Sequence, residues 1–196
     1  MNLRTIRLIL WSLVGVAAIA GAILYVTHKP APTAEAVTIG APFVLTDADG
    51  KAFSSEKLAG RPYAMFFGFT HCPDVCPTTL ARLAKLRNQL GKGPEAFDIV
   101  LVSVDPERDT PADIKNYVKL FGTPVIGLTG TVADIEAVKK SFGIFSEKVP
   151  DGNGGYTVDH SAQVLLFNRD GSFGGTIAFD ETDAPALQKL RNIADS

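Results

Sequence analysis

The chain has 196 residues, of which 46% are hydrophobic and 20% are charged, a composition typical of a globular protein long enough to bury a core. Arg4, Arg7 and Lys29 precede the first acidic residue, Glu35, so the rest of the chain carries 16 of the 19 basic residues against 21 acidic ones. The resulting net charge of −5, without a basic stripe, argues against nucleic acid as a partner.

The segment from Leu8 to Val26 has no charged residue and is almost wholly apolar. At helical rise it spans about 28 Å, close to the thickness of a hydrocarbon core. Two arginines precede it and one lysine follows it, so the positive-inside rule predicts a cytoplasmic N-terminus. We therefore predict an N-terminal transmembrane anchor at residues 1–27. A cleaved signal peptide is the alternative, because Ala18-Ile19-Ala20 resembles a cleavage site.

Residues 28–38 are rich in proline and alanine and are expected to form a tether. The domain then occupies residues 39–196. Its first element is a predicted hairpin over residues 42–53, because apolar alternation is interrupted by the turn pair Asp49-Gly50. A short helical turn is expected over residues 54–58.

Strands and helices alternate through most of the remaining domain. Apolar runs predict strands at residues 63–69, 97–104, 124–128, 162–167 and 173–179. Helical spacing and caps predict helices at residues 77–90, 111–121, 132–141 and 184–193. Residues 143–159 show no pattern and are expected to form an irregular insertion before the C-terminal hairpin. This order predicts an α/β fold with a mixed central sheet flanked by helices, similar to the thioredoxin superfamily.

The only two cysteines, Cys72 and Cys76, lie in the turn between the first core strand and its helix. Parallel sheets bind ligands at such turns, beyond the carboxyl end of a strand. The helix start also favours negative charge, so a thiol there loses its proton more easily.

Several roles fit two cysteines at this spacing. A structural disulfide would close a loop too small to constrain the unfolded chain much. A thiol oxidoreductase normally has the spacing C-x-x-C, whereas this chain has C-x-x-x-C. Such enzymes also carry a cis-proline before the hairpin, where this chain has Asp159-His160-Ser161. A peroxidase needs an arginine near the thiolate, and none is evident.

A metal site is the interpretation that includes His160. In a thioredoxin-like fold the segment before the hairpin faces the cysteine turn, so we expect Cys72, Cys76 and His160 to converge. Two soft sulfurs and one nitrogen suit Cu(I) and also accept Cu(II). Structural zinc more usually takes four protein ligands. His71 is expected to support the thiolates rather than to bind the metal.

Three acidic residues are predicted near this site. Asp74 and Asp159 are candidates either for hydrogen bonding to the ligands or for forming turns. Asp105 follows the neighbouring strand, and it is expected either along the same rim or in a turn that supports the fold.

Three motifs resemble the SCO/SenC family of copper chaperones for cytochrome c oxidase assembly. They are Gly-Phe-Thr-His-Cys-Pro-Asp-Val-Cys-Pro-Thr-Thr-Leu at 68–80, Val-Ser-Val-Asp-Pro-Glu-Arg-Asp-Thr-Pro at 102–111 and Val-Asp-His-Ser at 158–161. The resemblance extends from about Val37 to the C-terminus. The sequence departs most from the family pattern in the insertion before Tyr156, where the glycine-rich tip does not match that pattern.

The resemblance implies a membrane-tethered domain that binds one copper ion, Cu(I) or Cu(II), through Cys72, Cys76 and His160. It implies assembly of the dinuclear copper centre of oxidase subunit II, by copper delivery or by reduction of that subunit's cysteines. A second periplasmic copper chaperone is the expected donor, and the expected location is the bacterial inner membrane with a periplasmic domain. This function is not enzymatic; the alternative is a thiol–disulfide oxidoreductase or redox sensor that uses Cys72 and Cys76.

Overall fold

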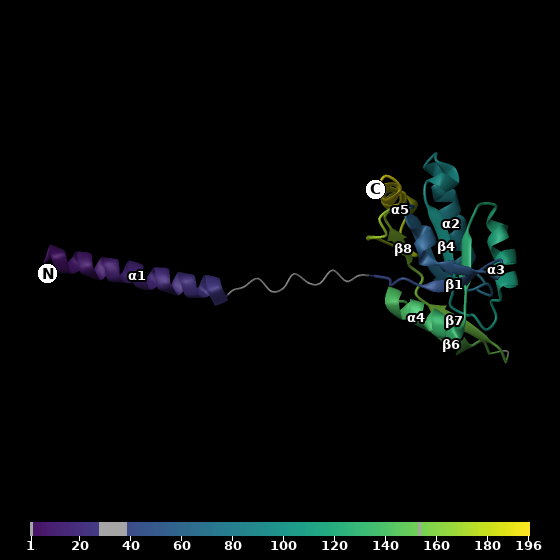
Figure 1. Ribbon diagram of the computed structural model, residues 1–196, viewed down its shortest axis with the longest axis horizontal. Coiled ribbons are helices and arrows are strands. Elements are labelled where there is room, and N and C mark those ends of the chain that lie inside the picture. Colours follow the sequence, from purple (N-terminus) through teal and green to yellow (C-terminus); the bar gives the residue numbers. More distant parts are fainter. Residues whose placement is uncertain (1, 28–38, 153) are drawn as a thin grey trace. The chain divides into compact units, whose positions relative to one another are not determined.

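The structure is a computed structural model that describes residues 2–27, 39–152 and 154–196. The chain divides into two compact units, Met1–Val37 and Thr38–Ser196, which are both drawn in Figure 1. The tether predicted at residues 28–38 lies outside the described residues, as does Asn153 in the glycine-rich tip.

The described residues of the first unit form the helix α1 (Leu3–Thr27). Over Leu3–Gly21 this helix is long and apolar enough to cross a membrane, a criterion that a signal sequence near the N-terminus also meets. Within Leu3–Gly21, where the side chains are described, the large apolar side chains are exposed, including Trp11 at 72%. Such exposed apolar side chains on the described part of the helix are consistent with the predicted anchor.

The second unit is built on a seven-stranded sheet in the order β2-β1-β5-β4-β3-β8-β9 (Figure 1). The strands are β1 (Val44–Asp47), β2 (Ala52–Ser54), β3 (Tyr63–Gly68), β4 (Asp98–Ser103), β5 (Ile126–Thr129), β8 (Val164–Phe167) and β9 (Phe173–Ile177). β3, β4 and β5 are parallel, whereas β1 and β8 run antiparallel to their neighbours. The sheet is therefore mixed, as predicted.

Helices cover this sheet on both faces. They are α2 (Val75–Gln89), α3 (Pro111–Val118), α4 (Val132–Phe142) and α5 (Asp183–Ala194), with 3₁₀ turns at Ser55–Leu58, Gly93–Glu95 and Lys119–Phe121. Phe142 of α4 packs on Phe67, while Gly68 of β3 lies against Cys76 of α2. Because successive strand residues face opposite sides, α4 and the start of α2 cover opposite faces.

Capping chemistry fixes the starts of two helices. Thr110 and Thr131 each accept a hydrogen bond from the backbone N–H three residues later, and the carboxylates of Asp113 and Asp134 accept one from the backbone N–H of the cap residue. These capping boxes confirm the predicted starts of α3 and α4. α2 begins two residues before the predicted Pro77, because proline is tolerated anywhere in a first turn, where its missing N–H has no helical partner.

The prediction of an irregular insertion at residues 143–159 was wrong. Two antiparallel strands, β6 (Ser146–Pro150) and β7 (Tyr156–His160), form a separate two-stranded sheet there. Of these ten residues only Val158 is buried. The hairpin therefore lacks the apolar periodicity by which a half-buried strand is recognised.

Candidate metal centre

The two cysteines lie at the start of α2, at the carboxyl end of β3. Cys76 is in the first turn of the helix and is fully buried, whereas Cys72 precedes the helix and is partly exposed. The backbone N–H of Cys76 donates to Sγ of Cys72 at 3.3 Å. This N–H is one of those that a helix start leaves without a helical partner, and it favours a thiolate.

Gly68 makes room for the buried sulfur. A Cβ atom at this position would lie 2.9 Å from Sγ of Cys76 and 2.8 Å from the side chain of Phe66. Only glycine lets β3 approach the start of α2 so closely.

His160 is the last residue of β7, and its ring turns toward the cysteines. Nε2 lies 3.4 Å from Sγ of Cys76, and Nδ1 lies 3.0 Å from the carbonyl oxygen of Ser161. A carbonyl only accepts, so Nδ1 carries a hydrogen, and Nε2 is the ring nitrogen directed at the sulfurs and available to a metal ion. The rings of Phe66 and Phe69 each contact the imidazole edge-on, with 5.8 Å between the ring centroids. These rings shield one side of the site from water.

The structure thus brings together the three ligands predicted from the sequence. Sγ of Cys72, Sγ of Cys76 and one ring nitrogen of His160 lie within 4.8 Å of one another, and they form the one such group among the described residues. An open hollow of about 240 Å³ adjoins Cys72 and His160. Two sulfurs and one imidazole can hold a soft metal ion, with access from this hollow.

The two thiols differ in acidity. The Cys76 thiol donates to the Cys72 sulfur, which lowers the pKa of Cys72 to about 4, with further help from His160 and two backbone N–H groups. The same contact and burial raise the pKa of Cys76. In the metal-free protein Cys72 is therefore the thiolate and Cys76 its neutral partner.

This difference predicts selective alkylation of the reduced protein. Between about pH 8 and pH 5 an ordinary thiol loses about tenfold in thiolate fraction per pH unit, but Cys72 stays ionised down to its pKa of about 4. We expect iodoacetamide to label Cys72 at a nearly constant rate across this range and to leave the buried Cys76 largely unlabelled. Tandem mass spectrometry locates the adduct, and a tenfold fall in rate per pH unit would contradict the assignment.

The other candidates near the site do not join the ligand group. Nδ1 of His71 contacts the Thr70 hydroxyl at 3.0 Å and lies 3.7 Å from Asp109. Asp74 is the cap residue of α2 and accepts from Thr78, while Asp159 is an exposed strand residue. Of the two roles predicted for Asp159, the turn is excluded, because Asp159 pairs with Glu147 across the β6–β7 hairpin.

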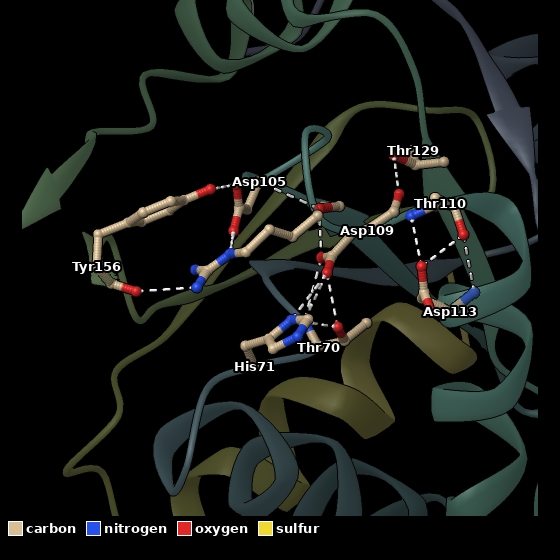
Figure 2. A network of polar contacts seen from close by, with 10 residues as sticks. Thr70, His71, Asp105, Asp109, Thr110, Asp113, Thr129 and Tyr156 are labelled. Carbon is tan, nitrogen blue, oxygen red and sulfur yellow. Dashed lines mark hydrogen bonds and ion pairs between the residues drawn. The ribbon is translucent and has the colours of Figure 1, made fainter. Parts of the chain in front are cut away.

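Asp105 and Asp109 are both fully buried, and Figure 2 shows the polar contacts that they make, Asp109 with Thr70 and Asp105 with Tyr156. Asp109 accepts from the Thr70 amide at 3.1 Å, the Thr70 hydroxyl at 2.6 Å and the Ser103 hydroxyl at 2.6 Å. Asp105 binds Arg108 and accepts from the Tyr156 hydroxyl at 2.9 Å. Of these residues only Asp105 was singled out individually from the sequence. The contacts of these residues join segments that are distant in the sequence, although four of the residues lie in the 102–111 motif: Ser103, Asp105, Arg108 and Asp109.

Comparison with known proteins identifies the family. The SCO1/SenC family model matches residues 31–195. The chain belongs to the SCO1/SenC family. A structure of Bradyrhizobium japonicum ScoI with copper bound is 42% identical, with a TM-score of 0.72 over 79% of this SCO1/SenC chain and 99% of that chain. This likeness confirms the predicted family and the thioredoxin-like fold.

Two further relatives bear on function. SCO1 homolog 1, mitochondrial, of Arabidopsis thaliana is 39% identical over 147 residues, which are 74% of this SCO1/SenC chain but only 44% of that protein. The chain thus spans less than half of that relative. BsSco, described as a cytochrome c oxidase assembly protein of the Sco family with a disulfide switch, is 26% identical with a TM-score of 0.62, covering 80% of this chain and 94% of that one.

Proposed function

We propose that this protein binds one copper ion through Cys72, Cys76 and His160 and serves the assembly of cytochrome c oxidase. The observation that carries the proposal is the convergence of two sulfurs and an imidazole nitrogen within 4.8 Å. The copper-bound Bradyrhizobium relative supports the choice of metal.

The donor set itself favours copper over zinc. Among the described residues, no histidine, cysteine or carboxylate joins these three residues as a fourth ligand. Structural zinc is almost always held by four protein ligands, whereas Cu(I) is satisfied by two thiolates with one imidazole. Thiolate ligands must be reduced and deprotonated, so oxidation to a disulfide releases the ion.

The specific role that we propose is to help build the dinuclear copper centre of oxidase subunit II. Cys72 is partly exposed and borders an open hollow. A thiol of an acceptor protein can therefore replace Cys72 as a copper ligand before the buried Cys76 dissociates from the ion.

The helix α1 would hold the protein in the bacterial inner membrane, with a cytoplasmic N-terminus and a periplasmic domain. Protease added to spheroplasts should then digest the domain.

Copper titration of the reduced full-length protein in detergent tests the metal site. We expect one Cu(I) or Cu(II) per chain, and a weaker Cu(II) complex in His160→Ala because imidazole is the ligand that Cu(II) prefers here. His71→Ala is the matched control, since its ring lies outside the ligand group, and it should bind copper as the wild type does. Equal Cu(II) binding by wild type and His160→Ala would refute the site.

A thiol–disulfide oxidoreductase is the second candidate. The acidic, accessible Cys72 above a buried neutral Cys76 is the arrangement of an attacking and a resolving thiol, and BsSco has a disulfide switch. Copper-free reduced protein mixed with oxidised subunit II separates the two roles. Stoichiometric reduction of the subunit II cysteines by this metal-free protein, with its own Cys72 and Cys76 oxidised to a disulfide, favours the reductase, and formation of the dinuclear centre only with the copper-loaded protein favours delivery.

Gly68→Ala tests the packing behind the site. The added methyl group would press on Sγ of Cys76 at 2.9 Å, so we expect copper affinity to fall about tenfold, as when a supporting residue of a metal site is lost. Gly174→Ala is the matched control, because its Cβ atom meets Ile193 of α5 at 2.8 Å, remote in sequence and structure from the sulfurs. If both variants lose stability but neither loses affinity, the sulfur position does not depend on Gly68.

A further inference from the structure

The hairpin that carries His160 needs an external attachment. β6 and β7 pair only with each other, and neither belongs to the seven-stranded sheet. An isolated two-stranded hairpin is marginally stable in water, and this one buries only Val158. Tyr156 begins β7 and His160 ends it, so whatever fixes Tyr156 also limits where His160 can lie.

The loop after β4 supplies that attachment. The Tyr156 hydroxyl donates to Asp105 at 2.9 Å, and Nη1 of Arg108 donates to the Tyr156 carbonyl oxygen at 2.9 Å. The Arg108 guanidinium also lies 3.8 Å from the centre of the Tyr156 ring. Figure 2 shows Tyr156 reaching across to Asp105. One residue of the hairpin is thus held at its hydroxyl, its ring and its backbone.

Charge and burial make this attachment specific. Asp105 is fully buried, and Nε of Arg108 forms an ion pair with it, so the carboxylate orients the guanidinium that stacks on Tyr156. A buried carboxylate is costly unless it is paired and hydrogen-bonded. At the edge of the same contact, Lys148 of β6 pairs with Glu107, but both side chains are about half exposed and contribute little.

We propose that Tyr156, held by Asp105 and Arg108, is a positioning residue that fixes His160 against the two cysteines. The inference rests on the proposed copper site. It adds that the loop after β4 controls the position of the His160 imidazole, through its contacts with Tyr156, four residues earlier in β7. Cu(II) binding depends on it most, because Cu(I) retains two thiolates when the imidazole is misplaced.

A double-mutant cycle on the reduced full-length protein tests this. Tyr156→Phe keeps the ring over Arg108 and removes only the bond to Asp105. We expect it to weaken Cu(II) binding about tenfold, measured by competition with a chelator, and to reduce the nitrogen hyperfine coupling in the Cu(II) electron paramagnetic resonance spectrum. In the His160→Ala background the same change should have no effect, since no imidazole remains to be positioned.

The controls separate positioning from folding. Tyr63→Phe, at the other end of β3, removes a hydroxyl remote from the site and should leave Cu(II) affinity unchanged. Arg108→Gln gives a second test, because it removes the guanidinium that contacts the ring and carbonyl oxygen of Tyr156. It should weaken Cu(II) binding more than the control Arg61→Gln does. Equal losses from Tyr156→Phe in both backgrounds, or no loss in either, overturn the positioning role. If His160→Ala itself binds Cu(II) like the wild type, the proposed copper site has failed instead.

Discussion

Replacing Cys76 by alanine is expected to abolish stoichiometric copper binding. Cys76 supplies one of two sulfurs, and its Sγ is also the ligand atom 3.4 Å from Nε2 of His160. Loss of a residue that merely supports a metal ligand costs about 10–100-fold in affinity, so loss of a ligand should exceed the upper end of that range. The measurement is Cu(I) competition with a chelator of known affinity, under reducing conditions.

Thr79→Ala is the control for this result, because it also shortens a buried side chain of α2 but removes no sulfur. We expect it to bind copper like the wild type. If Cys76→Ala keeps an affinity within about tenfold of the wild type, the buried sulfur is not a ligand and the site must be formed without it.

Asp109→Ala is expected to cause the largest loss of stability among the residues around the site. Its fully buried carboxylate accepts hydrogen bonds from the Thr70 amide, the Thr70 hydroxyl and the Ser103 hydroxyl. Without it these donors are left unpaired, at a cost of roughly 1–3 kcal/mol for each buried group. We expect the free energy of unfolding of the domain to fall by about 3 kcal/mol, measured by urea denaturation.

Asp113→Ala is the matched control, since this carboxylate is exposed and closes the capping box of α3. It should cost no more than about 1 kcal/mol. Thr70 also begins the loop that carries Cys72, so Asp109→Ala should weaken copper binding in addition. Equal destabilisation by the two variants would show that Asp109 is not the anchor of this loop.

The core fold could be predicted because its signals are local. β3 reads as a continuous apolar run and is buried at all six positions, as expected for a strand covered on both faces. The cysteine pair is visible for the same reason, because its position between a strand and a helix follows from two adjacent patterns. His160 was placed by topology, through its position before β8.

The support of the site could not be predicted, because its contacts join distant segments. Arg108 and Tyr156 are 48 positions apart, and neither has a pattern that indicates burial or pairing. The β6–β7 hairpin was missed because exposed, charged strands such as Ser146–Pro150 pair through their backbones without an apolar face. A buried polar network of this kind becomes evident only when the folded contacts are known.

X-ray absorption spectroscopy of the copper-loaded protein tests the central claim most directly. The proposed site requires that each copper ion in the reduced wild-type protein has two sulfur neighbours and one imidazole nitrogen, and that the nitrogen is lost in His160→Ala. A spectrum with one sulfur or none, or an imidazole that persists in His160→Ala, would contradict it.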